Sequence, residues 1–131
     1  KQEYFRKRVS NITQIKIDPP LIPEYKRKAQ ASIADRTNYW AEITGWRPKK
    51  LRITSAKSRW GSCNINGTVA INWWLVFAPL SVIDYIVIHE LAHLVERNHS
   101  RRFWEKVKRH IPDYKERKKW LKENGHLLSI G

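Results

Sequence analysis

Two stretches of the chain carry apolar residues at the spacing of helices. Residues 23–44 have a rough apolar stripe, and Gly45 stands where such a helix would end. Residues 82–95 are apolar on nearly every side, which is typical of a helix buried in a core. Ser81 and Asp84 are placed as a capping box at the start of this second helix. The sequence therefore predicts one helix on the surface and another at the centre of the fold.

Between these helices the pattern changes to that of strands. Residues 51–54 alternate in polarity, and residues 59–63 and 68–71 are predicted as two further strands. Asn66-Gly67 predicts a tight turn that joins the second strand to the third. Because a tight turn joins neighbouring strands, we expect a small antiparallel sheet.

Two shorter helices are predicted after the apolar one. Ser100 is a good N-cap for a helix that contains Phe103. Asp113, with Glu116 three residues later, is placed to cap a last helix that Gly125 would end. The order of one helix, three strands and three further helices predicts the α+β fold class.

The central helix contains the motif with the most chemistry in the chain. Residues 89–93 read His-Glu-Leu-Ala-His. At 3.6 residues per turn, His89 and His93 lie about 40° apart around the helix axis, so both imidazoles can reach one ion. Glu90 lies on the flank of the same face, where a carboxylate can take a proton from a metal-bound water. This spacing is that of zinc hydrolases, and the polar side chains would be costly in an apolar helix without a metal or hydrogen bonds.

A catalytic zinc ion usually has three protein ligands and a water, and His99 is the predicted third ligand. It stands ten residues after His89, and on an unbroken helix it would lie about 15 Å further along the axis. The helix must therefore stop before His99. Asn98 tolerates the left-handed conformation that ends helices, and Ser100 can begin the next one.

The third ligand has an alternative, which is a carboxylate from Glu105 or Glu116. The chain also departs from the longer metzincin motif. That motif needs a glycine where this chain has Glu96, and a later methionine, whereas this chain contains no methionine. The sequence therefore excludes an ordinary metzincin.

Several further motifs accompany this one. They are Arg59-Trp60-Gly61-Ser62-Cys63, Asn72-Trp73, Asn98-His99-Ser100, Phe103-Trp104 and Pro112-Asp113-Tyr114. With them, residues 25 to about 128 resemble the YgjP-like metal-dependent hydrolases, a family grouped with SprT-like and WLM-type zinc proteases. The resemblance implies a compact zincin-like metallopeptidase fold with one zinc ion per chain. The ligands that it implies are His89, His93 and His99, and the base is Glu90. We therefore expect residues 1–22 to be a basic segment or linker and residues 23–131 to form the hydrolase domain.

The predicted strand at residues 59–63 is the candidate wall of a substrate cleft, since extended substrates often pair with an edge strand above the metal. Arg59 is then a candidate to stabilise the developing oxyanion, although it can equally be an ordinary surface arginine. Tyr114 is the alternative oxyanion donor. For the tryptophans of these motifs, Trp60, Trp73 and Trp104, packing beneath the metal site is favoured over stacking on substrate.

Composition bounds the environment and the partners. The chain has 26 basic and 12 acidic residues, a net charge of +14, which predicts either an acidic partner such as nucleic acid bound without sequence preference or a solvated surface. Its one cysteine, Cys63, excludes an internal disulfide framework and is expected to be a packed residue in a reducing compartment. With no signal peptide and no apolar run of membrane length, we expect a cytoplasmic protein without a membrane partner.

Three functions remain open from the sequence. The first is a zinc metallopeptidase acting on a peptide or protein. The second is a metal-dependent nucleotide pyrophosphatase, because zinc-activated water also attacks phosphorus and the basic surface attracts triphosphates. The third is a nucleic-acid-binding module with a structural zinc. Glu90 argues against the third, because a structural site needs no base, and the absence of a Gly-rich phosphate loop ranks the second below the first.

Overall fold

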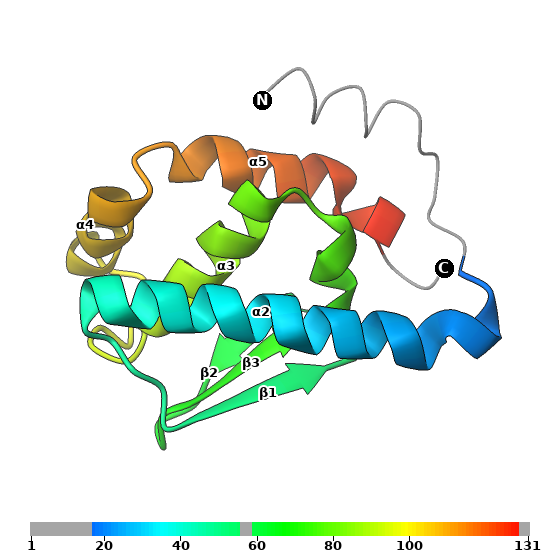
Figure 1. The fold of residues 1–131 in the computed structure, drawn as a ribbon. Helices are drawn as coiled ribbons and strands as arrows, with labels where there is room; N and C mark the ends of the chain where they lie inside the picture. The colour runs from blue at the N-terminus through cyan, green and yellow to red at the C-terminus, as the bar shows by residue number, and fades with distance from the viewer. Residues whose placement is uncertain (1–16, 56–58, 129–131) are drawn as a thin grey trace.

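The computed structural model describes residues 17–55 and 59–128 of the chain. Its elements, in chain order, are η1 (Pro19–Leu21), α2 (Ile22–Thr44), β1 (Lys50–Thr54), β2 (Gly61–Cys63), β3 (Thr68–Asn72), η2 (Trp73–Phe77), α3 (Leu80–Ala92), α4 (Arg101–His110), α5 (Tyr114–Asn124) and η3 (Gly125–Leu128). The predicted α+β class and the predicted succession of helices and strands are confirmed (Figure 1). Most of the predicted basic segment 1–22 lies outside the described residues.

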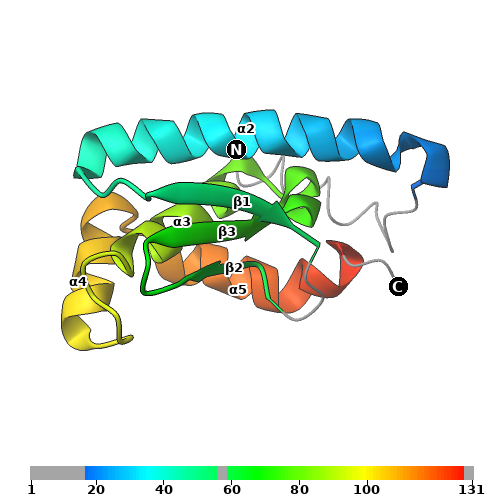
Figure 2. The same cartoon turned by 90° about the horizontal axis from the view of Figure 1, so that it is seen from below.

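Helix α3 is the central element of the fold. It contacts α2, α4 and α5 and also strands β2 and β3, while α2 contacts β1 (Figures 1 and 2). This explains why α3 is apolar on nearly every side, since every face of the helix meets another element. The largest fully buried side chains come mainly from α3, β3, α4 and η2, with Ile33 from α2, and they include Trp73, Ile88, Leu91 and Phe103.

The sheet is mixed, and in this respect the prediction of an antiparallel sheet was wrong. Strands β2 and β3 are antiparallel as predicted, with Ser62 opposite Ala70, but β1 runs parallel to β3, with Ile53 opposite Ile71. The strand order is β1-β3-β2. The apolar strand β3 takes the centre, where Ile71 is fully buried, and separates the two strands that precede it in the chain. Strand β2 is therefore an edge strand, as expected for a cleft wall.

The turn before β3 lies where Asn66-Gly67 predicted it, but it is wider than a two-residue turn. The amide of Gly67 donates to the carbonyl of Asn64 at 3.1 Å, and the side chain of Asn64 accepts from the amides of Asn66 and Thr68 at 3.0 Å each. Gly67 has φ of 85°, a conformation that favours glycine. The side chain of Asn64 thus stabilises a turn that the Asn-Gly pair alone did not specify.

The helices end close to the predicted residues, but several of the predicted capping interactions are not formed. Gly45 ends α2 in the left-handed conformation, with φ of 78°, and the Ser100 hydroxyl accepts from the Phe103 amide at 3.4 Å at the start of α4. The capping box predicted at Ser81 and Asp84 was wrong, because α3 begins after Pro79 and has no side-chain cap. Asp84 instead forms an ion pair with Arg36 of α2.

The last helix shows the same difference. Asp113 occupies the N-cap of α5 but makes no capping bond, because its carboxylate pairs with Arg117 at 2.9 Å. Gly125 follows α5 as predicted, although its φ of −56° is not left-handed. A Cβ at Gly125 would lie 3.2 Å from the ring of Trp60, so close packing against the residue before β2 explains this glycine. None of the helices among the described residues is long and apolar enough to cross a membrane.

Candidate metal centre

The C-terminal end of α3 presents two histidines and then releases the chain. His93 is the C-cap of the helix, and the amides of Leu94 and Val95 turn to carbonyls three residues back, at 3.0 and 3.1 Å. The predicted left-handed residue at Asn98 was wrong, since among the described residues only glycines have positive φ. The helix is therefore closed by a tightened last turn, and the loop that follows carries His99 back toward α3.

Three imidazoles meet at this end of α3. Ligand atoms of His89, His93 and His99 all lie within 4.8 Å of one another. The Nε2 atoms of His93 and His99 are 3.1 Å apart. His93 is 8% exposed, whereas His99 faces solvent, so the group reaches from the core to the surface. Sequence reasoning placed His99 beside the two helical histidines, and the structure brings all three together.

The surroundings of the histidines fix their orientation. The Nδ1 atom of His93 lies 3.0 Å from the carbonyl of Glu96 and can donate to it, which leaves Nε2 free to bind an ion. Phe103, fully buried at the start of α4, lies against all three rings, with centroids 5.0, 4.4 and 5.0 Å from those of His89, His93 and His99. Burial, together with the charges of His89 and His93, lowers the pKa of His99 and favours the neutral form that a metal needs.

These residues fit a bound metal ion. Three imidazole rings converge where their nitrogens cannot all satisfy one another by hydrogen bonding, and three histidines with one side open to solvent are a donor set that zinc accepts. Within the part of the chain that the structure describes, this group includes neither predicted alternative ligand. Glu105 is instead exposed and pairs with Arg101 at 3.5 Å.

Glu90 is buried between α3 and the edge of the sheet. Its residue exposure is 4%, and its Oε2 atom lies 3.0 Å from Nδ1 of His89. A Cβ at Gly61 in β2 would lie 2.9 Å from Cγ of Glu90, so only glycine lets the strand approach this closely without a shift. The carboxylate therefore stands between the three histidines and a strand edge.

Arg97 is a residue of this site that sequence reasoning missed. Its guanidinium donates to the carbonyls of Cys63 at 2.9 Å, Asn64 at 3.3 Å and His93 at 3.2 Å. It thereby ties the end of β2 to the loop that carries the histidines. No periodicity or motif marks an arginine in a loop, so only the contacts reveal it. The thiol of Cys63 lies 3.6 Å from Arg97, and burial raises its pKa, in agreement with a packed residue.

The two oxyanion candidates are placed differently. Arg59 lies just before β2 with an exposed side chain, and its carbonyl accepts from the Asn72 amide group at 3.3 Å. Tyr114 stacks on Trp104 with ring centroids 5.0 Å apart, and Trp104 in turn lies against His89 and His99. Tyr114 is thus one ring removed from the histidines. Both assignments stay predictions.

A histidine group beside a buried glutamate and a free strand edge is typical of a metal-dependent hydrolase. A family model described as the YgjP-like metallopeptidase domain matches residues 6–124, and the chain belongs to this family. The chain is also similar to the crystal structure of the metallopeptidase zymogen of Pyrococcus abyssi abylysin, with a TM-score of 0.62 and 26% identity. The match covers 70% of this chain and 93% of that chain. The search of curated proteins found no match.

Proposed function

We propose that the protein is a zinc-dependent peptidase in which His89, His93 and His99 hold one zinc ion and Glu90 is the general base. The observation that carries the proposal is the convergence of the three imidazoles next to a carboxylate that is almost fully buried. Membership of the metallopeptidase family and the likeness to a metallopeptidase zymogen support peptide hydrolysis as the reaction.

Zinc, when bound, supplies a Lewis acid that polarises the scissile carbonyl and acidifies a water molecule. The protein supplies the rest. Nδ1 of His89 can donate to Oε2 of Glu90 at 3.0 Å, which orients both side chains and leaves the other carboxylate oxygen free to take the proton of the attacking water. Glu90 then returns this proton to the leaving amine. Its burial keeps bulk water from competing for the carboxylate.

The edge strand β2 is the proposed binding site for the peptide backbone. An extended substrate can pair with the outer edge of β2 at Gly61, where this strand reaches Glu90, whereas the carbonyl of Cys63 is already bonded to Arg97. Arg59, two residues before β2, and Tyr114, beyond Trp104, are the proposed alternatives for stabilising the oxyanion. A cytoplasmic site of action and electrostatic binding of nucleic acid belong to the proposal as well.

The experiment is a parallel assay of zinc-loaded protein on an unfolded protein, a DNA-bound protein and nucleoside triphosphates. We expect cleavage of polypeptide and no release of pyrophosphate. Hydrolysis of triphosphates alone would replace the peptidase by the alternative nucleotide pyrophosphatase. Binding of nucleic acid without any hydrolysis would favour the module with a structural zinc.

Zinc content measured on the same preparations tests the ligands. We expect one zinc ion per chain in the parent and in Glu105→Ala, which serves as the matched control because Glu105 was the alternative ligand. His99→Ala should lose most of the metal. Full retention of zinc by His99→Ala would contradict the three-histidine assignment.

A further inference from the structure

A pocket of about 810 Å³ lies between α4 and α5, next to the metal centre. Trp104 from α4 and Tyr114 from α5 form one end of it as a stacked pair, with an angle of 19° between the rings. The ring centroid of Trp104 is 5.7 Å from that of His89 and 5.9 Å from that of His99. The aromatic end of the pocket is therefore in contact with two of the three histidines.

The remainder of the pocket is basic. Its lining along α5 contains Lys115, Lys118, Lys119 and Lys122, against a single carboxylate from Glu123. These lysines follow one another at i, i+3, i+4 and i+7, so they share one face of the helix. None of the described ion pairs includes any of the four. The pocket thus gathers positive charge that the described carboxylates leave uncompensated.

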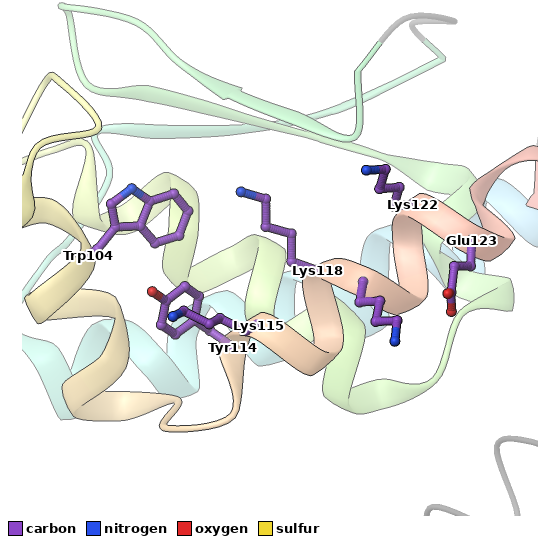
Figure 3. A pocket seen from close by; sticks show the side chains of 7 residues that line it. Trp104, Tyr114, Lys115, Lys118, Lys122 and Glu123 are labelled. Carbon is purple, nitrogen blue, oxygen red and sulfur yellow. The ribbon is translucent and has the colours of Figure 1, made fainter.

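The lysines are ordered along the pocket relative to the metal centre. Lys118 extends from α5 toward Trp104, with its Nζ atom 5.0 Å from the ring centroid, and Lys122 lies one turn further away (Figure 3). The ammonium group of Lys118 is thereby held near the histidines by the aromatic end. A charged ligand that extends from the metal centre along α5 meets Lys118 first and Lys122 second.

We propose that this pocket is a substrate subsite for acidic side chains, and that it selects polypeptides with Asp or Glu near the scissile bond. The proposal rests on the proposed peptidase function, because the occupant of a pocket in contact with the histidines is the molecule held there for hydrolysis. Aspartate and glutamate complement unpaired ammonium groups, and the apolar end accepts the methylene part of a side chain.

The geometry of α5 also specifies the spacing of the acidic residues. Lys118 and Lys122 are separated by four residues, or roughly 6 Å along the helix axis. In an extended peptide, side chains that point to the same side are two residues apart, or about 6.6 Å. From this backbone spacing we expect the pocket to favour an acidic residue, any residue and a second acidic residue over two adjacent acidic residues.

Three short peptides of equal length test the proposal. One carries two glutamates separated by one residue, one carries the same glutamates side by side, and one carries glutamines in the first arrangement. Their affinities are measured by fluorescence anisotropy on zinc-loaded Glu90→Gln protein, so that binding is read without hydrolysis. Their kcat/KM values are measured on the parent.

We expect the separated glutamates to bind best and the glutamines worst. The double variant Lys118→Gln/Lys122→Gln should weaken binding of the separated-glutamate peptide about 3- to 10-fold and leave the glutamine peptide unchanged. The matched control is Lys28→Gln/Lys108→Gln, which removes the same charge from two exposed lysines outside the pocket. The control should retain the preference of the parent.

Equal affinities for the three peptides, or an equal loss in both double variants, would overturn the subsite. A single-stranded oligonucleotide that displaces the acidic peptide and binds more tightly, with a loss in the pocket variant alone, would reassign the pocket to nucleic acid. Selective binding of the acidic peptide without cleavage of any peptide would support the pocket and refute the proposed peptidase. Cleavage of all three peptides at one rate would support the proposed peptidase and refute the acidic subsite.

Discussion

Helix α3 carries two polar clusters that differ in whether hydrogen bonds within the protein satisfy their polar atoms. Near its start, Asp84 meets Arg36 of α2 in a two-bond ion pair, with distances of 2.7 and 2.9 Å. Near its end, His89 and His93 meet His99 with their nitrogens turned toward one another. The first cluster is complete within the fold, whereas we propose that an ion completes the second. The comparison separates a polar group that joins two helices from one that is the candidate metal site.

The ion pair between Arg36 and Asp84 has further contacts that support it. The guanidinium of Arg36 lies 4.4 Å from the ring of Tyr39, and the hydrogen bond to Asp84 raises the pKa of Arg36. Each charged group thus has its partner within the fold. Such a pair is expected to contribute to the stability of the fold and nothing to the reaction.

The largest expected effect is on the reaction. Glu90→Gln should lower kcat/KM about 10²- to 10⁴-fold, because the amide is nearly isosteric with the carboxylate but cannot accept a proton. The same change at the other cluster, Asp84→Asn, should leave the activity of the folded fraction unchanged. The measurement is peptide cleavage per folded molecule, with zinc content determined on each sample. Full activity of Glu90→Gln would move the base to another residue.

The next effect is on folding. Arg36→Ala should lower the free energy of unfolding by about 3 kcal/mol, because it leaves Asp84 buried without its partner. We expect a loss at the lower end of the range for buried ion pairs, because the side chain of Arg36 is 24% exposed and that of Asp84 is 10% exposed. Urea unfolding measures it, and Arg47→Ala, which breaks an exposed ion pair with Glu42, is the control with a far smaller loss. Equal losses in the two variants would remove the distinction.

Zinc binding should raise the free energy of unfolding through the histidine cluster and not through the ion pair. Zinc at a hundredfold excess over its dissociation constant should raise the free energy of unfolding by about 2.7 kcal/mol in the parent. The same gain is expected in Glu90→Gln, which keeps the ligands, and in Arg36→Ala, from a lower starting point. His99→Ala should show little gain. Thermal or urea unfolding with zinc or with chelator provides the values, and an equal gain in His99→Ala would argue for ligands elsewhere.

The smallest predicted effect concerns the approach of β2 to α3. Gly61→Ala places a methyl group 2.9 Å from Cγ of Glu90 and should cost about 1–3 kcal/mol of stability as overpacking. Because Glu90 must shift, kcat should fall while zinc binding is retained. The matched control is Gly45→Ala, where no atom lies within 4 Å and only the left-handed backbone is disturbed. A drop in kcat for Gly45→Ala as large as for Gly61→Ala would mean that global destabilisation explains both.

The sequence predicted those parts of the molecule that depend on local pattern. The helix that carries His89 and His93 and the return of His99 to its side follow from residue spacing, and the N-cap at Ser100 follows from its residue type. The caps predicted for the two ends of α3 were wrong. The role of the three histidines as ligands still stays a prediction. What the sequence supports least is pairing over long distances along the chain, where no local preference selects a partner.

Three features show this limit. The parallel pairing of β1 with β3 depends on which strand buries more apolar surface, and residue alternation does not decide that. Asp84 matched a capping box by spacing but is bound to Arg36, 48 residues away. Arg97 had no pattern to mark it, and its partner Cys63 lies 34 residues away. In each case a contact between distant segments replaced or added to the local rule.

The bonds of Arg97 have a consequence for the order in which the molecule assembles. They join the edge strand to the histidine loop across 34 residues of chain, and closing a loop of that length carries an entropic cost that local helix formation does not. We therefore expect the helix with His89 and His93 to form before β2 arrives beside it. A newly made chain would then bring its histidines together before β2 offers a place for a peptide, so a site able to cut neighbouring chains would be complete only late in folding.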